Sequence, residues 1–370
     1  MPPKAKARPT RMVAPGRRPA TDRALAAFEE RFAKGLGTPL EVPTETAYQA
    51  IPTGSMALDA QIGIGGWPKG RICEMWGPEH AGKTTVAMLS AAQAQIDDPE
   101  RRVAWIDMEQ TFDPKWAKSL GVDLDRLYLY RPLTAEDVAD AAREFMSSGM
   151  FSLVVLDSVG GMISRAEMEK EADQDTVGQV PKIVTRMVKI AAPMAYRNET
   201  TVLVINQVRS VIGGFGASES TGGGWALKHV SSVKVNIRSG EPIKARVRGE
   251  EVTIGRKVLA RVEKNKINGR LGRAEFTLIS QPTAQNPMVG VDQVAETFDV
   301  AKKFGVLGKG GYSTLPDGAR INGRDKSIEH LRDNPGTVTA LRAQVLESVI
   351  GIAAEDDDEI DPEDMERLKA

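Results

Sequence analysis

The stretch GPEHAGKTT (residues 77–85) directs the interpretation of the whole chain, because its spacing Gly-x-x-x-x-Gly-Lys-Thr is typical of a phosphate-binding loop. Gly77 and Gly82 permit backbone angles that a side chain would hinder, so the loop can wrap a phosphate with its own N–H groups. RICEMW before the loop is strand-like, and TTVAMLSAAQAQI after it is helix-like, with a helix N-terminus that favours anions. A chance glycine-rich turn is the weaker interpretation, since strand, loop and helix occur in this order.

Residue types within the loop indicate a nucleotide with a metal ion. We expect Lys83 to reach the β- and γ-phosphates and the Thr84 hydroxyl to ligate Mg²⁺. ATP and Mg²⁺ are therefore the predicted cofactors. The predicted nucleotide-binding residues of the loop are Gly77, Pro78, Glu79, His80, Ala81, Gly82, Lys83, Thr84 and Thr85.

Composition limits the class of protein. A chain of 370 residues with 41% hydrophobic content suits a folded protein of two or three domains. No apolar run approaches the roughly 18 residues of a membrane span. The net charge of −1 means that any DNA binding must come from a local patch. Cys73 is the only cysteine, which excludes an internal disulfide, argues against a zinc site and favours a reducing compartment, here the cytoplasm.

The fold class follows from strands that alternate with helices between residue 51 and about residue 280. Apolar strands (RRVAWID, LYLY, FSLVVLD and TVLVINQ) separated by helical stretches predict an α/β fold with a mostly parallel sheet and helices on both faces. SSVKVNIRS, EVTIGRKVLARVEKNK and RAEFTLI have strand periodicity and are expected to extend the sheet as antiparallel strands. The helix that contains PKIVTRMVKI is expected to stop at Pro193.

Composition shifts divide the chain into five segments. A basic arm (residues 1–20) lacks the apolar stretch of a secretory signal, and an amphipathic helix (21–48) is expected to mediate oligomerisation or to pack on its own subunit. The core (49–283) is followed by a small C-terminal α/β domain (284–352) and an acidic tail (353–370). Both charged ends are either solubilising disorder or electrostatic devices, the arm touching DNA and the tail competing with DNA for a basic surface.

Three strand ends carry polar residues, and active residues of such sheets gather at the carboxyl ends of strands. FSLVVLDS places Asp157 where a P-loop protein usually holds Mg²⁺ through water, with a helix cap as the alternative. RRVAWIDMEQ ends in Asp107, expected to be structural, and Glu109, which could orient or deprotonate the attacking water. VLVINQ ends in Gln207, a candidate γ-phosphate sensor before a glycine-rich loop that is either a switch or a plain insertion.

Together these motifs resemble the bacterial RecA recombinase family over nearly the whole chain. TGSMALDAQIGIGGWPKGRICEMWGPEHAGKTT, WIDMEQTFDPKWAKSLGVD, LVVLDSVGGM, VINQVRSVIGGFG, GGGWALKHVSS, VEKNKI and EHLRDNPGT have counterparts in the same order. The resemblance implies a RecA-like ATPase core and a DNA-dependent ATPase that forms a filament on single-stranded DNA and pairs it with a homologous duplex in recombination and repair. Within it, Glu109 matches the catalytic glutamate, beside Lys83, and Gln207 matches the γ-phosphate sensor.

The resemblance also assigns residues that the pattern alone does not. Asp113 and Trp116 match positions that contact adenine, Trp116 by stacking. Lys264 and Lys266 match catalytic lysines that reach the ATP of the adjacent subunit and stabilise charge as the γ-phosphate leaves. Without the resemblance, the two lysines would be interpreted only as solvent-exposed residues of a strand.

Two loops are expected to contact DNA if the resemblance holds, the first over about residues 167–182 and the second over 208–225. Basic side chains and glycine-rich backbone bind phosphates whatever the base sequence, and apolar side chains can wedge between bases. The predicted DNA-binding residues are Lys182, Arg186, Lys189, Arg209, Phe215, Gly223 and Gly224.

Departures from the family pattern keep a second function open. Val177 stands in the first loop where the family usually has Met, and His229 replaces an aromatic residue at the subunit interface. A filament that coats DNA or signals damage, with weak strand exchange, is the alternative to an active recombinase. A hexameric helicase would need an accessory domain that is not visible, and the single cysteine excludes a relative with a zinc module. The sequence leaves open a cellular or viral origin, and whether the filament promotes self-cleavage of a repressor.

Overall fold

The computed structural model describes residues 48–169, 179–210, 219–221, 224–283, 288–308 and 310–355. The predicted basic arm, the predicted N-terminal helix up to residue 47 and nearly all of the predicted acidic tail lie outside these ranges. Every helix within the ranges is too short or too polar to span a bilayer.

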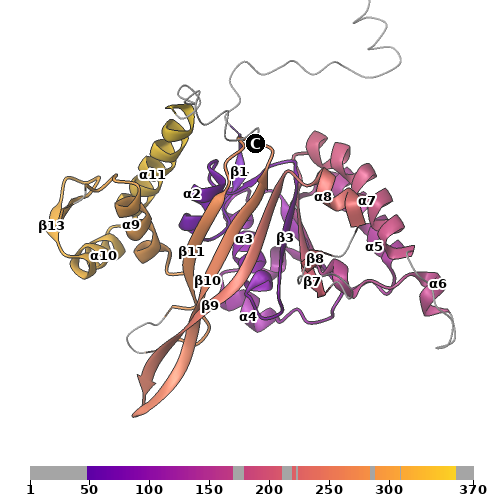
Figure 1. Ribbon diagram of the computed structural model, residues 1–370, viewed down its shortest axis with the longest axis horizontal. Helices are drawn as coiled ribbons and strands as arrows, with labels where there is room; N and C mark the ends of the chain where they lie inside the picture. The colour runs from indigo at the N-terminus through magenta and orange to yellow at the C-terminus, as the bar shows by residue number, and fades with distance from the viewer. Residues whose placement is uncertain are drawn as a thin grey trace, which may run out of the picture. The chain divides into compact units, whose positions relative to one another are not determined.

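A large sheet forms the centre of the described chain (Figure 1). Its strands are β3 (Ile72–Gly77), β4 (Arg102–Asp107), β5 (Leu127–Tyr130), β6 (Phe151–Asp157), β7 (Thr201–Ser210), β8 (Glu219–Thr221), β9 (Val233–Val247), β10 (Glu250–Asn265) and β11 (Gly272–Ile279). The order is β11-β10-β9-β3-β7-β6-β4-β5, with β8 paired to the end of β7. All neighbours from β9 to β5 along this path are parallel, which confirms the predicted α/β fold with a mostly parallel sheet.

The extension of the sheet differs in one respect from the prediction. β9 runs parallel to β3, so antiparallel pairing begins only between β9 and β10 and continues to β11. The connection from β7 to β9 includes the helix α8 (Gly224–Val230), and a crossover of this kind is what a parallel pair requires. β9 and β10 then continue as a long hairpin beyond their neighbours (Figure 1).

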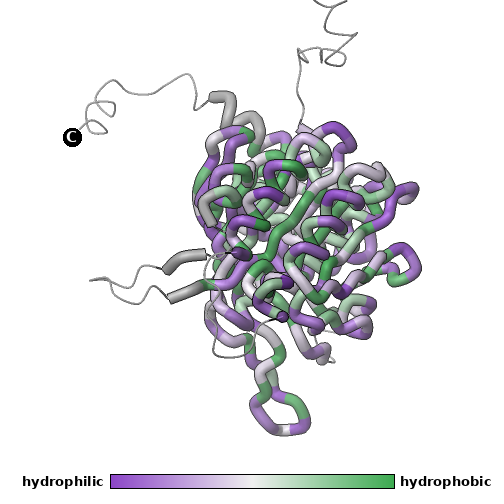
Figure 2. The backbone as a smooth tube through the Cα atoms, turned by 90° about the vertical axis from the view of Figure 1, so that its right-hand side faces the viewer, coloured by the Kyte–Doolittle hydropathy of each residue, from purple (hydrophilic) through white to green (hydrophobic). Residues whose placement is uncertain are grey.

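Helices cover both faces of the sheet and enclose two apolar cores. α3 (Lys83–Asp97) lies on one face, and α5 (Ala135–Ser148) and α7 (Gln179–Arg197) lie on the other. Figure 2 shows the hydrophobic segments running through the interior and the hydrophilic ones mostly in the outer turns. A capping box of Thr134 and Asp137 begins α5.

Helix α7 continues through Pro193 to Arg197, so the predicted stop at Pro193 is wrong. A proline removes one backbone hydrogen bond and disfavours the preceding turn. Here the buried side chains of Ala191 and Ala195, on either side of the proline, pack into the core beneath α7. That tertiary packing outweighs the local penalty.

The middle of the sheet is sealed from solvent. Trp67, Trp105 and the single cysteine, Cys73 on β3, are fully buried. Burial raises the pKa of the Cys73 thiol well above its usual range.

The short connecting elements are β1 (Ala50–Ile51), α2 (Met56–Ile62), β2 (Trp67–Pro68), α4 (Pro114–Ser119), η1 (Leu124–Arg126), η2 (Val159–Gly161) and α6 (Arg165–Met168).

The C-terminal segment forms a third apolar core together with α2. Met56 and Ala60 of α2 pack among its buried residues, such as Phe298 and Leu341. The last helix continues to Glu355, into residues expected to begin the acidic tail. Its elements are α9 (Gln293–Lys303), β12 (Tyr312–Thr314), β13 (Arg320–Asn322), α10 (Arg324–Asp333) and α11 (Pro335–Glu355).

A half-buried carboxylate links the C-terminal segment to the start of α2. Glu296 on α9 accepts hydrogen bonds from the Ser55 hydroxyl (2.6 Å) and from the backbone N–H groups of Met56 (2.6 Å) and Ala57 (3.3 Å). It therefore caps the N-terminus of α2 from another part of the chain. Burial raises the pKa of Glu296 to about 7, although its hydrogen bonds from Ser55 and the backbone oppose this change.

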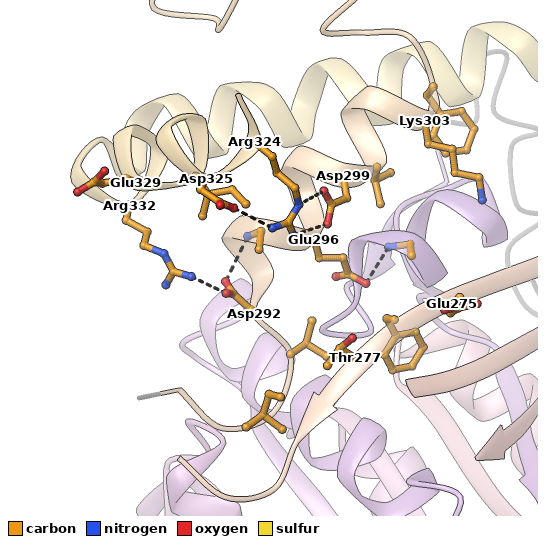
Figure 3. Close-up of a pocket in the computed structure, with 18 of the residues that line it drawn as sticks. Glu275, Thr277, Asp292, Glu296, Asp299, Lys303, Arg324, Asp325, Glu329 and Arg332 are labelled. Atoms are coloured by element: carbon orange, nitrogen blue, oxygen red, sulfur yellow. Dashed lines mark hydrogen bonds and ion pairs between the residues drawn. The ribbon is translucent and has the colours of Figure 1, made fainter. Parts of the chain in front are cut away.

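A cavity of about 880 Å³ lies beside this junction, between β11, α2 and the C-terminal helices (Figure 3). Its charged side chains largely bind one another: Arg324 donates to both oxygens of Asp299 (2.8 and 2.7 Å), and Arg332 donates to Asp292 (2.5 Å). Both arginines of the lining are thus already paired with carboxylates, and we assign the cavity no binding role.

Candidate functional site

The predicted site residues meet at the carboxyl ends of the parallel strands. Gly77 lies opposite Gln207, and Asp107 lies opposite Asp157, so the ends of β3, β7, β4 and β6 share one edge of the sheet. A cavity of about 520 Å³ opens there. Its lining consists of Glu79, His80, Ala81, Gly82, Lys83, Thr84, Thr85, Glu109, Thr111, Trp116, Asp157, Ser158, Ile205, Gln207, Arg256, Leu278, Ile279 and Ser280.

The loop 77–85 has the backbone of an anion cradle. Gly82 is the N-cap of α3 with φ of 99°, and a Cβ at Gly77 would lie 1.9 Å from the carbonyl oxygen of Ile237. Lys83 Nζ folds back to the carbonyls of Gly77 (2.9 Å) and Pro78 (2.6 Å). Burial lowers the pKa of Lys83, while the acidic neighbours, Asp157 first, act in the opposite direction. The ammonium group is thus held at the cavity, where an anion would replace its carbonyl partners.

The oxygen atoms predicted to hold Mg²⁺ lie together. Thr84 Oγ1 donates to Asp157 Oδ2 at 3.0 Å. Burial raises the pKa of Asp157 to about 7; the Thr84 hydrogen bond lowers it, and the nearby charges of Glu109 and Asp107 raise it further. A hydroxyl and a carboxylate are hard oxygen ligands of the type that Mg²⁺ prefers, and a bound cation would favour the ionised form of Asp157. The two residues therefore fit the ion.

The predicted catalytic glutamate and γ-phosphate sensor are in direct contact. Gln207 Nε2 donates to Glu109 Oε1 at 2.6 Å, and the Ser158 hydroxyl donates to the same oxygen. Sequence reasoning missed Ser158, although its place directly after Asp157 in FSLVVLDS was a usable signal. The carboxylate of Glu109 is thereby oriented from two strand ends.

Asp107 has the structural contacts expected of it. Its carboxylate accepts the backbone N–H groups of Thr111 (3.1 Å) and Phe112 (3.2 Å) and the guanidinium of Arg131 (3.1 Å). It therefore holds the turn that follows β4.

The two residues predicted to contact adenine, Trp116 and Asp113, have different positions in the structure. Trp116 lines the cavity, and its Nε1 lies 3.4 Å from Thr85 Oγ1. Asp113 is absent from the lining and caps α4, accepting from the N–H groups of Lys115 and Trp116. Its expected contact with adenine stays a prediction, and in this structure it orients the helix that carries Trp116.

Strands β10 and β11 close the cavity with residues that the sequence did not indicate. Arg256 lines the cavity and donates to the His80 carbonyl at 2.5 Å. Leu278, Ile279 and Ser280 of the β11 end complete this wall. Their strands were expected, but no spacing in the sequence placed their ends beside the phosphate loop.

Lys264 and Lys266 lie apart from the cavity lining of their own chain. Both side chains extend from the end of β10 to the last carbonyls of α8: Lys266 donates to His229 at 2.5 Å, and Lys264 donates to Lys228 and, at 3.2 Å, to His229. Cations suit these carbonyls because the C-terminus of a helix is the negative end of its dipole.

The predicted DNA-binding residues are described in part. Lys182, Arg186 and Lys189 are exposed along α7, at spacings that place them on one face. Arg209 belongs to the end of β7, and Gly224 begins α8. Phe215 and Gly223, with the middle of both predicted DNA loops, lie outside the described residues.

Comparison with known proteins agrees with this arrangement. Residues 19–283 match the family model of the RecA N-terminal domain. The chain belongs to the RecA family. It is 37% identical to Protein RecA of Thermus thermophilus over 355 residues (93% of this chain and 99% of the relative), 36% identical to Protein RecA of Ruminococcus albus over 331 residues (89% and 80%), and 34% identical to Protein RecA of Frankia alni over 345 residues (93% and 96%). As a RecA-family member it binds ATP and is a DNA-dependent ATPase that acts as a recombinase in DNA repair, so the scaffold alternative is not favoured.

Proposed function

We propose that this RecA-family chain hydrolyses ATP in the 520 Å³ cavity, with Lys83 on the phosphates, Trp116 on the adenine and Thr84 and Asp157 around Mg²⁺. The observation that carries the proposal is that the Lys83 ammonium, the Asp157 and Glu109 carboxylates and the Gln207 amide all line one cavity. When bound, Mg²⁺ held by Thr84 and Asp157 would supply positive charge that stabilises the developing charge on the phosphates.

Glu109 and Gln207 supply the remaining chemistry of hydrolysis. Glu109 orients the attacking water and accepts its proton, held in place by Ser158. Gln207 exchanges its present hydrogen bond to Glu109 for one to the γ-phosphate. Loss of the phosphate returns Gln207 to Glu109, and this alternation is a switch at the start of the second DNA loop.

The filament role rests on Lys264 and Lys266. Neither lines the cavity of its own chain, whereas both project from one end of β10. In a filament on single-stranded DNA, they would reach the ATP of the adjacent subunit and stabilise charge as the γ-phosphate leaves. ATP would then hold subunits together, and hydrolysis would loosen them.

DNA is proposed to bind along the face of α7 and the second loop. Lys182, Arg186 and Lys189 place three cations on one helix face, and such contacts bind phosphates whatever the base sequence. Sequence-independent contacts leave the bases of the first strand free to pair with a homologous duplex.

ATP hydrolysis with and without single-stranded DNA tests this assignment. We expect strong stimulation by DNA in the wild type and its loss in Lys83→Ala, because the phosphates lose their cation. Lys326→Ala removes an exposed lysine of α10, away from the cavity, and is the matched control that should keep stimulation. Hydrolysis that DNA does not change, or that Lys83→Ala retains, would contradict the proposed site.

A further inference from the structure

A series of buried polar side chains crosses the sheet beside the γ-phosphate sensor. Gln207 donates its backbone N–H to Asn206 Oδ1 (3.0 Å), and the Asn206 amide donates to Glu74 Oε1 (3.0 Å). The other carboxylate oxygen of Glu74 lies 3.2 Å from Lys234 Nζ. Glu74 and Asn206 are fully buried and Lys234 is 9% exposed, so water screens these contacts little.

The series continues to the strand that carries Lys264. Lys234 Nζ lies 4.9 Å from the centre of the Trp76 ring, and Trp76 Nε1 donates to Glu263 at 2.9 Å. Glu263 occupies an irregularity of β10 directly before Lys264. β3, β9 and β10 are neighbouring strands (Figure 1). In their register, Glu74 lies opposite Lys234 and Lys234 lies opposite Lys264. One row of side chains thus joins the ATP edge of β7 to the outer end of β10.

Stability alone does not favour this arrangement. Taking two charges out of water stabilises a fold no better than apolar residues of the same volume, and often less. Glu74 and Lys234 nevertheless lie in the middle of the sheet: Glu74 binds the residue before Gln207, and Lys234 lies opposite Lys264 in the strand register.

We infer that Glu74 and Lys234 are positioning residues that couple the γ-phosphate sensor Gln207 to Lys264. Phosphate loss at the subunit's own ATP would then change how the same subunit holds the next ATP along the filament. A shift of the Gln207 backbone would move Asn206 and thereby weaken or strengthen its hydrogen bond to Glu74. The inference rests on the proposed roles of Gln207 and Lys264.

Lys264 is the group at which the coupling can be measured. Burial lowers the pKa of Lys264 to about 8; the charge of Lys266 lowers it further, that of Glu74 raises it and that of Lys234 lowers it. The charged or titratable residues around Lys264 are Glu263 on β10, Lys266 just after β10, Lys234 on β9, Glu74 on β3, and Lys228 and His229 on α8.

The experiment is the pH dependence of kcat/KM for ATP in the DNA-bound protein, which reports groups that titrate before ATP binds. Because Lys264 acts as a cation, the value should fall above about pH 8. Glu74→Gln removes a charge that raises the pKa, so the fall should move to lower pH by about half a unit. Lys234→Met removes a charge that lowers the pKa, so the fall should move to higher pH.

Opposite shifts from two single substitutions cannot come from a general loss of stability. Lys234→Arg keeps the charge and should behave as the wild type. The double variant Glu74→Gln/Lys234→Met leaves neither charge buried without its partner, and it should restore the wild-type profile while lowering the Hill coefficient for ATP towards 1. Single-variant profiles that stay unshifted or move in the same direction, or a double variant with the wild-type Hill coefficient, would overturn the inference.

Lys264→Met separates this coupling from the proposed function. It should abolish the fall near pH 8 and reduce DNA-stimulated hydrolysis. If it changes neither, the role of Lys264 at the neighbouring ATP is wrong, and the coupling is wrong with it. If it changes both while the Glu74 and Lys234 variants keep the wild-type profile, only the coupling is wrong.

Discussion

Asp157 and Glu296 are two carboxyl groups whose pKa is raised to about 7 by loss of hydration, yet their surroundings differ. Each lines a cavity and has an acidic neighbour, but the Asp157 carboxyl accepts only one hydrogen bond from the described residues, that of the Thr84 hydroxyl. Glu296 accepts a hydroxyl and two backbone N–H groups at the start of α2. A raised pKa therefore identifies an acid with little hydration. Whether that acid belongs to a functional site depends on how many of its oxygen lone pairs remain free to bind a ligand.

The largest expected effect belongs to Asp157. Asp157→Asn removes the charge that would favour Mg²⁺, so DNA-stimulated ATP hydrolysis should fall by at least about 100-fold. Melting in the absence of nucleotide should stay the same or rise, because a costly buried carboxyl is gone. The matched control is Asp140→Asn, at a side chain that is 76% exposed on α5. If Asp157→Asn retains hydrolysis, the Asp157 carboxyl has a structural role only, and the contrast with Glu296 is wrong.

Glu296 should show the reverse pattern. Glu296→Ala leaves two N–H groups and one hydroxyl of the α2 start without their acceptor, so the free energy of unfolding should fall by about 2 kcal/mol. Denaturant unfolding measures this loss, and hydrolysis per folded molecule should be unchanged. Arg324→Ala breaks an ion pair whose side chains are about half exposed and should cost less than about 1 kcal/mol. Activity lost at full stability would show that Glu296 serves more than the fold.

A third contrast between the two carboxyl groups is expected in the pH dependence of stability. Both carboxyl groups have folded-state pKa values near 7, above the roughly 4 of an unfolded chain, so each makes the unfolding free energy decrease as pH rises from about 4.5 to about 7. Glu296→Gln should flatten that decrease with or without ligand. Mg²⁺ with a non-hydrolysable ATP analogue should flatten only the part due to Asp157, because the cation favours its carboxylate. If ligand also removed the contribution of Glu296 to the pH dependence, Glu296 would be linked to the nucleotide site and the contrast with Asp157 would be wrong.

Asp157 could be found in the sequence and Glu296 could not, for a physical reason. The phosphate loop, the apolar strands and the polar residues after them are local patterns, and parallel strands bring their carboxyl ends together whatever the connections. Glu296 caps a helix whose first residue lies 240 positions earlier, and such a contact depends on tertiary packing alone. The same limit applies to Arg256 at the phosphate loop, to the parallel pairing of β9 and to the passage of α7 through Pro193.

Cys73 makes the chain a convenient background for fluorescent labelling. Its sulfur lies fully buried on β3, and burial keeps the thiol protonated at neutral pH. A maleimide dye should therefore ignore the native protein and react with a cysteine introduced at an exposed position, such as Lys118 on α4. Donor- and acceptor-labelled subunits could then report the spacing along an assembled filament by energy transfer, without removal of the natural cysteine.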